Sequence, residues 1–293
     1  MGEGDYRPVR NELGFYSVEP MPTNDERREF YEKKYYQEGY GCYRTEYDEE
    51  ELAYIFSQPK VARHLMKELT GLETGRVLDA GCGQGFFAAF FAENGWDVAA
   101  TDFSHHGIET HNPQLEDVFL KGDLLRVLDE LQEKGERFDL VNLHGVLEHL
   151  VDPGGILGLA QGVLQDGGVL RVAVPNDYSD FQRMLLERGV TDESWFVPPE
   201  HLHYFSFDSL KALVDASGFK TRRVLGDFPI ELFLLNEHSN YNADRSKGKA
   251  AHRARIAAEN YLLEMGLDKY VAYYEAAAKA SLGRQAIVFA QAA

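Results

Sequence analysis

The sequence predicts an α/β fold in which helices cover both faces of a doubly wound, mostly parallel sheet. From residue 76 onward, short apolar runs alternate with segments of helix length, which is the pattern of repeated strand–helix–strand units. The first apolar run enters a glycine-rich turn at residues 81–85, and a segment of helix length follows at once. The chain has 293 residues, of which 44% are hydrophobic, so it is long enough to bury a substantial core.

The predicted strands are short and rich in Val, Leu and Ala. In chain order they cover Arg76–Ala80, Asp97–Asp102, Asp117–Leu120, Phe138–Leu143, Val169–Val174, Thr221–Leu225, Glu231–Leu235 and a closing run, Gln285–Ala290. The predicted helices cover Phe86–Asn94, Gly154–Leu164, Tyr178–Arg188 and Asp208–Ser217. Gly95 and Gly218 stand directly after two of these segments, as helix-ending residues often do.

Segments of different character stand at the two ends of this pattern. Residues 1–65 are polar and rich in tyrosine, with three prolines near the start, and we expect an irregular arm followed by helices. Residues 66–293 then form the main domain. Within it, an Ala-rich, charged segment at about residues 236–283 lacks strand signals and is expected to be a helical insertion before the last strand.

Composition excludes several classes of function. The net charge of −18 disfavours nucleic acid as a partner, because such binding needs many Lys and Arg contacts to phosphate. The two cysteines are Cys42 and Cys82, and Cys82 lies between glycines in a turn with little room for a disulfide. The N-terminus lacks a basic region followed by an apolar one, and no run of about 18 apolar residues occurs. We therefore expect a cytoplasmic protein with no membrane segment.

The glycine-rich turn is the strongest indication of a ligand site. Asp79 precedes Gly81, Gly83 and Gly85, and glycines at such a turn let a ligand approach the free N–H groups at the start of a helix. A dinucleotide fingerprint would require glycine at position 86, which is Phe86. No Lys or Arg occurs between residues 76 and 121 to hold a pyrophosphate, so a nicotinamide cofactor is disfavoured.

Two acidic residues follow the turn at strand ends. Asp102 comes about twenty residues after Gly81, the spacing that places a carboxylate on ribose hydroxyls. Asp123 follows the third predicted strand and can accept a hydrogen bond from an adenine amino group. The pattern suits a nucleoside with a positively charged substituent in place of phosphates.

These motifs together resemble the class I methyltransferases that use S-adenosylmethionine. The resemblance rests on Asp79–Gly85, Asp102, Gly122-Asp123 and Phe138–Val141, which recur in the family's order, and it covers roughly residues 70–230. It implies a seven-stranded sheet with an antiparallel closing strand. It also implies that Gly81, Gly83 and Gly85 line the methionine part, that Asp102 binds the ribose and Asp123 the adenine, and that Asp79, Cys82, Phe103, Leu124 and Leu143 complete the cofactor site.

Two pairs of histidines are candidates for catalysis. The fourth predicted strand delivers His144 and His149 to the cofactor side, and a histidine near neutral pH can remove the proton of a hydroxyl acceptor. The alternative is that these residues pack the start of a helix. His201 and His203 stand in an aromatic loop after the fifth strand, where they either act as base or acceptor clamp or brace the loop.

No metal is expected from the sequence. The pair Glu148-His149 resembles the metal-binding helix of some RNA-terminal methyltransferases, which place another Glu three residues before that Glu. This chain has Gly145 at that position. The missing carboxylate makes a hard divalent ion less plausible.

The acceptor is predicted to be a small molecule. Residues 227–235, with residues 283–285, resemble methyltransferases of surface-polysaccharide and sugar biosynthesis, which implies O-methylation of a sugar or sugar nucleotide. The alternatives are a quinone, phenol or natural product, or a scaffold protein that binds the cofactor without catalysis. A basic run of Arg245, Lys247, Lys249, Arg253 and Arg255 is either a clamp for an anionic acceptor or a solvated helix face.

The N-terminal arm is a candidate lid, because a methyl transfer site must exclude water yet admit an acceptor. In the resemblance, Tyr31, Tyr35, Tyr36 and Tyr40 cover the cofactor. The alternative is that Tyr31 and Tyr35, four residues apart, pack a helix onto the core. The sequence does not indicate an oligomeric state, and a homodimer stays open.

Overall fold

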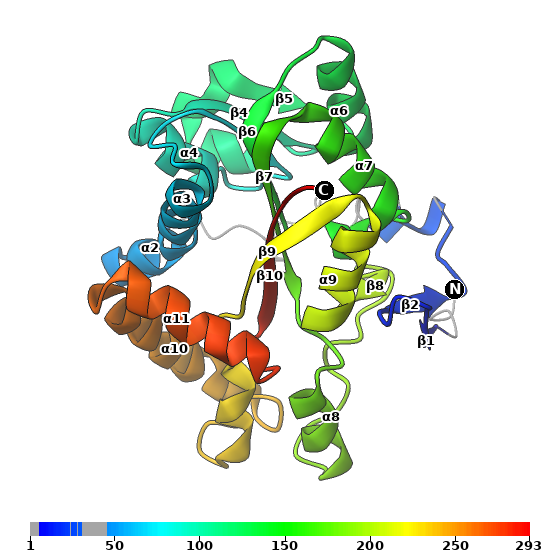
Figure 1. Cartoon of the computed structure of the whole chain (residues 1–293). Helices are drawn as coiled ribbons and strands as arrows, with labels where there is room; N and C mark the ends of the chain where they lie inside the picture. Colours follow the sequence, from blue (N-terminus) through cyan, green and yellow to red (C-terminus); the bar gives the residue numbers. More distant parts are fainter. Residues whose placement is uncertain (1–5, 24, 28, 31–45) are drawn as a thin grey trace.

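A seven-stranded sheet forms the centre of the protein, whose computed structural model describes residues 6–23, 25–27, 29–30 and 46–293 (Figure 1). The strand order is β5-β4-β3-β6-β7-β10-β9. The strands are β3 (Arg76–Ala80), β4 (Asp97–Asp102), β5 (Phe119–Lys121), β6 (Phe138–His144), β7 (Leu164–Pro175), β9 (Phe219–Leu225) and β10 (Gln285–Ala292). The neighbours from β5 to β7 are parallel, and β10 is antiparallel to both β7 and β9, as predicted for the closing strand.

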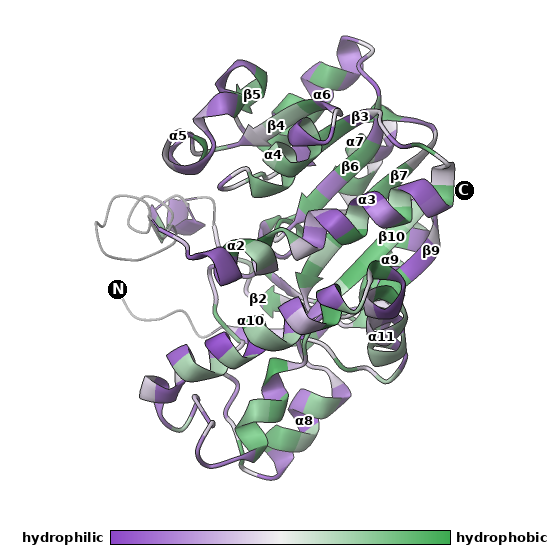
Figure 2. Ribbon diagram, turned by 90° about the vertical axis from the view of Figure 1, so that its left-hand side faces the viewer, coloured by the Kyte–Doolittle hydropathy of each residue, from purple (hydrophilic) through white to green (hydrophobic). Residues whose placement is uncertain are grey.

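Helices cover both faces of the sheet, which confirms the predicted fold class (Figure 1). One face carries α6 (Leu124–Glu133), α7 (Pro153–Val163) and α9 (Phe207–Ala216), and the other carries α3 (Ser57–Thr70), α4 (Phe86–Glu93) and α11 (Leu267–Lys279). Strands buried on both sides need apolar residues at nearly every position. Accordingly, β7 and β10 are apolar over most of their length (Figure 2).

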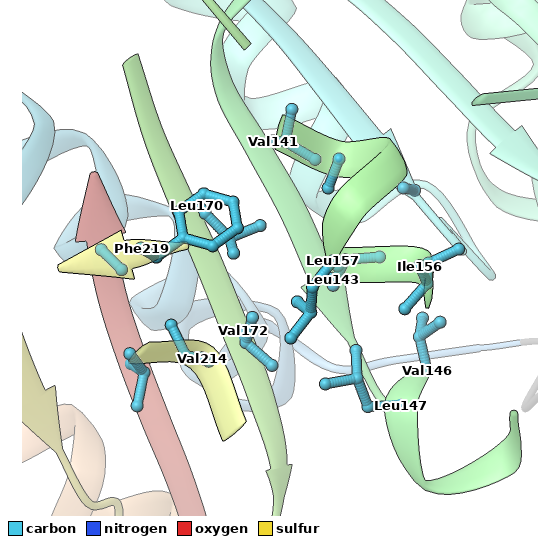
Figure 3. Close-up of a cluster of buried hydrophobic side chains, with 14 of the residues drawn as sticks. Val141, Leu143, Val146, Leu147, Ile156, Leu157, Leu170, Val172, Val214 and Phe219 are labelled. Carbon is cyan, nitrogen blue, oxygen red and sulfur yellow. The ribbon is translucent and has the colours of Figure 1, made fainter. Parts of the chain in front are cut away.

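The core under α7 and α9 holds the strand ends in place. Leu143 of β6 and Val172 of β7 pack in one buried cluster with Leu157 of α7 and Val214 of α9 (Figure 3). Each fully buried side chain of this size stabilises the fold by roughly 1.5–3 kcal/mol. The carboxyl ends of β3, β4 and β6 therefore form a rigid edge on which polar groups can be positioned.

The N-terminal arm differs from the irregular segment that we expected. It contains β1 (Arg7–Arg10) and β2 (Tyr16–Glu19), and β2 also pairs with β8 (His203–Tyr204) in a small antiparallel sheet. Val18 is buried with Trp195 and Tyr204, and this burial stabilises strands that are too short to be recognised by sequence pattern alone. The arm continues as predicted into helices, α2 (Glu49–Ile55) and then α3.

The C-terminal insertion is helical, as predicted. It contains η4 (Arg245–Lys247) and α10 (Gly248–Glu264) and continues into α11. Among the described residues, no helix is both long and apolar enough to cross a bilayer. Two further α-helices are α5 (His106–His111) and α8 (Asp180–Glu187). α8 starts two residues later than expected, because the Ser179 side chain caps it by accepting from Gln182 N–H.

Two predicted strands need correction. Residues 230–235 form a 3₁₀ helix, η3 (Ile230–Leu235), because Glu231 is buried against a side-chain network from the neighbouring loop rather than alternating between two faces. The predicted strand at Asp117 begins only at Phe119. The preceding residues form another 3₁₀ helix, η1 (Pro113–Val118), which starts with proline at a favourable position.

Candidate active site

The glycine-rich turn joins β3 to α4 and lies beside the loop that follows β6. The N–H groups of Gly81 and Cys82 donate to the Thr101 carbonyl at 2.8 and 3.0 Å, which fixes the turn to β4. Gly81 has a φ of 82°, and a Cβ there would stand 2.5 Å from Val146 Cγ2. Only glycine therefore allows the loop after β6 to approach. At Gly83, by contrast, no atom of the described residues lies within 4 Å of the Cβ position, so this part of the structure leaves the turn open on that side.

Gly85 and Cys82 complete the turn. Gly85 is the N-cap residue of α4. Burial and the nearby Asp79 and Asp102 carboxylates raise the pKa of the Cys82 thiol, so the thiol stays neutral and is not a nucleophile. Cys82 is a free cysteine. The other cysteine, Cys42, lies outside the described residues.

Asp102 ends β4 and is tied to the glycine turn. Its two carboxylate oxygens accept from Gly83 N–H and Ser104 N–H, each at 2.9 Å. Each carboxylate oxygen has a second lone pair, so the group keeps its capacity to accept from a ligand hydroxyl. Phe103 follows with 71% of its surface exposed, and such a ring offers a flat face on which a base can stack.

Three of the other predicted cofactor residues have evident structural roles. Asp123 caps α6, because its side chain accepts from Arg126 N–H at 3.2 Å. Leu124 is partly buried and packs against the apolar core. Leu143 is fully buried in that core, so at most its backbone faces a ligand (Figure 3).

Asp79 begins a buried polar chain that crosses the sheet. Asn142 donates to its Oδ1 at 2.7 Å, and Arg171 donates to Asn142 Oδ1 at 2.7 Å and to Gln58 of α3 at 2.8 Å. The other oxygen of Asp79 is buried without a partner. Burial raises the pKa of Asp79 to about 6, and the hydrogen bond from Asn142 and the Arg171 charge oppose that shift. The sequence reasoning did not identify Asn142 or Arg171; the only signal was an arginine inside an apolar strand.

Tyr47 is the arm residue that reaches the glycine turn. Its hydroxyl donates to Gln84 Oε1 at 2.9 Å, and its ring meets the Phe86 ring edge-on at 5.6 Å. The tyrosines that we predicted as a lid (Tyr31, Tyr35, Tyr36 and Tyr40) lie outside the described residues. A tyrosine of the arm thus lies at the turn, at a position that the sequence reasoning did not single out.

Glu148, His149 and His201 come together beyond β6 although about fifty residues separate them in the chain. The rings of His149 and His201 meet edge-on at 4.9 Å, and His149 Nε2 lies 3.9 Å from Glu148 Oε1. His149 Nδ1 is 2.7 Å from the Glu200 carbonyl. Because a carbonyl only accepts, Nδ1 carries the proton and the lone pair of the neutral ring is on Nε2.

Glu148 is unusually buried for a carboxyl group. It is 3% exposed, and its Oε2 has no hydrogen-bond partner among the described residues. Burial raises the pKa of Glu148 to about 8, with a smaller contribution from Asp177. The sequence pattern places Glu148 beside His149 in a pair that resembles a metal-binding helix, but it does not reveal the burial of the carboxyl group.

The other two candidate histidines are held by protein groups. His144 Nε2 lies 3.1 Å from Gln285 Nε2, and burial together with the Arg171 charge lowers the pKa of His144 to about 3. A base with so low a pKa is weak at neutral pH. His203 is buried, with Nδ1 2.9 Å from Ser17 Oγ and Nε2 3.4 Å from the Val151 carbonyl. Its geometry fits the bracing alternative.

Several arginines of the C-terminal half form ion pairs with carboxylates of the chain. Arg284 pairs with Asp177 at 2.5 Å, and Arg255 of the insertion pairs with Asp227 at 2.7 Å. Arg253, also in the predicted basic run, pairs with Asp48 at 2.5 Å. Lys247 of the same run pairs with Asp244 at 3.8 Å. Three of the five basic residues are therefore engaged by carboxylates of the chain itself, which weakens the anionic clamp as an interpretation.

A cavity of about 430 Å³ lies beside the Arg284–Asp177 pair, because Asp177 is one of its lining residues. Asn176 and Asp177 of the loop after β7 line it together with Tyr16 of the N-terminal hairpin. No residue of the glycine turn contributes to it. The open side of Gly83 and this cavity are thus separate features.

Comparisons with known proteins identify relatives of the chain. Residues 51–224, more than half of the chain, match a family described as a methyltransferase domain. The ubiquinone biosynthesis O-methyltransferase of Bradyrhizobium sp. (strain ORS 278) is 30% identical over 162 residues, which cover 52% of this chain and 64% of the relative. The protein of the same name from Rhodopseudomonas palustris (strain BisA53) is 29% identical with the same coverage. The matched region thus spans less than two thirds of these relatives.

A solved structure shares the fold. The magnesium protoporphyrin IX methyltransferase of Synechocystis PCC 6803, determined with bound SAH, has a TM-score of 0.50 and 13% identity. The alignment covers 91% of this chain and 100% of that protein.

Proposed function

Because the chain belongs to the methyltransferase-domain family, with S-adenosylmethionine as its cofactor, we propose that it methylates a ring hydroxyl of a small phenol- or quinol-type molecule. The names of the two reported relatives support an O-methylation of this kind. The sugar acceptor that we expected from the sequence has no counterpart in those names. The pairing of Arg253 and Arg255 within the chain also removes part of the support for a sugar diphosphate.

The cofactor is proposed to lie on the open side of the glycine turn. Asp102 would accept from the ribose hydroxyls through its remaining lone pairs, and Phe103 would stack on the adenine. The free oxygen of Asp79 is buried at the end of β3, where it suits the cofactor's ammonium group. Asp123 remains a proposed adenine contact that also caps α6.

The chemistry is a single displacement at the sulfonium methyl group. A lone pair of the acceptor oxygen forms the new O–CH₃ bond while the S–CH₃ bond breaks and its electron pair returns to sulfur. The hydroxyl proton must leave, because a protonated oxygen is a weak nucleophile. We assign its removal to His149, and the observation that carries this assignment is the Nδ1 hydrogen bond to the Glu200 carbonyl, which directs the basic lone pair to Nε2.

The test compares acceptors and a histidine pair. The purified protein with S-adenosylmethionine should add one methyl group to a catechol- or quinol-type compound and not to a nucleotide sugar, as followed by mass spectrometry. His149→Gln should lower turnover by roughly 10²–10⁴-fold while cofactor affinity stays unchanged. His238→Asn, at an 86% exposed position, serves as the matched control and should behave as the unchanged protein.

Two outcomes would contradict the proposal. Methylation of sugar nucleotides with no reaction of ring hydroxyls would restore the sequence-based expectation. Tight cofactor binding without turnover on any hydroxyl compound would favour the scaffold alternative.

A further inference from the structure

We infer that Glu148, His149 and His201 bind a divalent transition-metal cation of the zinc or iron(II) type. One ligand atom from each of these side chains lies within 4.8 Å of the other two. Ligand atoms around one tetrahedral zinc ion, at roughly 2.0–2.2 Å from the metal, stand about 3.3–3.6 Å apart. Each pair of ligand atoms therefore needs to approach by only about 1.5 Å or less, which rotation about side-chain bonds provides.

The backbone already holds the two ligand segments together. Leu202 N–H donates to the Glu148 carbonyl at 2.7 Å, and Tyr204 Oη donates to the His201 carbonyl at 3.2 Å. The proximity of the three side chains is thus built into the fold. A ligand set that is positioned before the metal arrives loses little conformational entropy on binding.

His149 has the arrangement of a metal-binding histidine. Metal-binding histidines usually donate their second ring N–H to a carbonyl or carboxylate, which sets the tautomer and the ring orientation. His149 donates from Nδ1 to the Glu200 carbonyl at 2.7 Å and turns Nε2 toward Glu148. The same bond that supports a basic Nε2 therefore also supports a coordinating Nε2.

Glu148 supplies an independent observation. Its carboxyl group is 3% exposed, and Oε2 has no hydrogen-bond partner. A buried polar atom without a partner costs roughly 1–3 kcal/mol, and more when the group is charged. A bound cation would satisfy this oxygen, whereas no described protein group does.

The ligand types favour one class of cation. Two imidazoles and one carboxylate with open positions suit zinc, iron(II) and cobalt(II), while magnesium and calcium prefer an all-oxygen shell. At the sequence level, the glycine at position 145 in place of a carboxylate disfavours a metal. In the structure, His201 supplies the third ligand from a distant loop.

The cation would also take part in the proposed methyl transfer, and only this catalytic role of the cation rests on the proposed function. The open positions would take the acceptor oxygen, and the cation would lower the pKa of the hydroxyl. In the metal-bound state, His149 Nε2 would hold the ion and the acidified hydroxyl would lose its proton to solvent. Direct proton transfer to His149, as proposed above, would belong to the metal-free protein. Binding of the cation alone needs no acceptor, so it can be tested separately from methyl transfer.

The experiment titrates the metal-stripped full chain with zinc(II) in a calorimeter and with cobalt(II) in an absorption spectrometer. One equivalent of zinc should bind, and cobalt should give visible bands of a nitrogen- and oxygen-coordinated ion. Glu148→Gln and His201→Asn should each weaken zinc binding at least 10-fold. His64→Asn is the matched control, because His64, Glu68 and Asp268 form the other group of ligand-type side chains among the described residues. It should leave zinc binding unchanged.

Each other result has a defined meaning. Absence of stoichiometric binding to the unchanged protein, or binding that is lost in His64→Asn and kept in His201→Asn, overturns the inference. The cobalt spectrum of the unchanged protein decides the matter even when a variant does not fold. Methyl transfer by a protein that binds no zinc would refute the metal site and leave the proposed function standing. Zinc binding without methyl transfer would refute the proposed function and leave the metal site standing.

Discussion

Replacing Gly107 by alanine should displace the glycine-rich turn at residues 81–85, although Gly107 lies outside that motif. Gly107 is the second residue of α5 (His106–His111), and a Cβ there would stand 2.3 Å from the Gly83 carbonyl oxygen and 3.1 Å from Gln84 Cα. Ordinary contacts begin at 3.4 Å, so the helix and the turn must separate by about 1 Å. Backbone atoms cannot yield as a flexible side chain does. Overpacking of this kind typically costs about 1–3 kcal/mol.

The same displacement should reach the cofactor. Gly83 N–H donates to Asp102 at 2.9 Å, and a shift of about 1 Å breaks that bond and moves the carboxylate proposed to bind ribose. We expect Gly107→Ala to bind S-adenosylmethionine at least 10-fold more weakly, which is about 1.4 kcal/mol. Calorimetric titration measures the affinity, and thermal unfolding measures the stability.

Gly158→Ala is the control, because this exposed glycine of α7 has no atom within 4 Å of its Cβ position. It should gain up to about 1 kcal/mol of stability from the better helix propensity of alanine and keep its cofactor affinity. If Gly107→Ala retains the melting temperature and the affinity of the unchanged protein, the contact between α5 and the turn does not fix the site. If it loses stability alone, the geometry of the turn matters less for binding than argued above.

Three further changes have defined outcomes. Asp102→Ala should weaken cofactor binding by roughly 1–3 kcal/mol in calorimetry, and an unchanged Kd would remove Asp102 from the site. Arg255→Met should destabilise the fold by roughly 3–5 kcal/mol in denaturant unfolding, because it leaves the buried Asp227 unpaired; adding Asp227→Asn should recover part of the loss. The pKa of His144 in the folded protein lies below its value in the unfolded chain, so the free energy of unfolding should fall as the pH drops below about 6.5, by up to about 1.4 kcal/mol per pH unit. His144→Gln should flatten this pH dependence. Equal slopes for the two proteins from pH 7 to 5 would contradict the assignment.

The parts of the fold that the sequence predicts are those set by local pattern. Arg76–Ala80 and Asp97–Asp102 are strands with the predicted bounds, because each is an apolar run closed by an acidic residue at the sheet edge. The closing strand is also recognisable from its composition. Residues 230–235 are as apolar as a strand, yet they form a 3₁₀ helix, since the position of Glu231 depends on partners from other segments.

The parts that local pattern misses are contacts between distant segments. Gly107 looks like an ordinary helix residue until α5 is packed on the turn. Arg171 is a charged residue in an otherwise apolar strand, and only the tertiary contacts with Asn142 and Gln58 explain its burial. Similarly, His201 is one histidine in a loop until the Leu202 N–H bond brings it to Glu148. Each depends on a tertiary contact that spacing along the chain does not encode.

The N-terminal arm acts on both sides of the site through different residues. Its hairpin holds the loop after β7, because Val18 N–H donates to the Leu202 carbonyl at 2.9 Å and Ser17 Oγ contacts His203. Leu202 in turn bonds to Glu148, so the hairpin fixes the loop that carries His201 against the end of β6. Farther along the arm, Tyr47 contacts Gln84 of the glycine turn. Because the two contacts fall on separate segments, the early strands constrain the histidine cluster while Tyr47 constrains the cofactor turn.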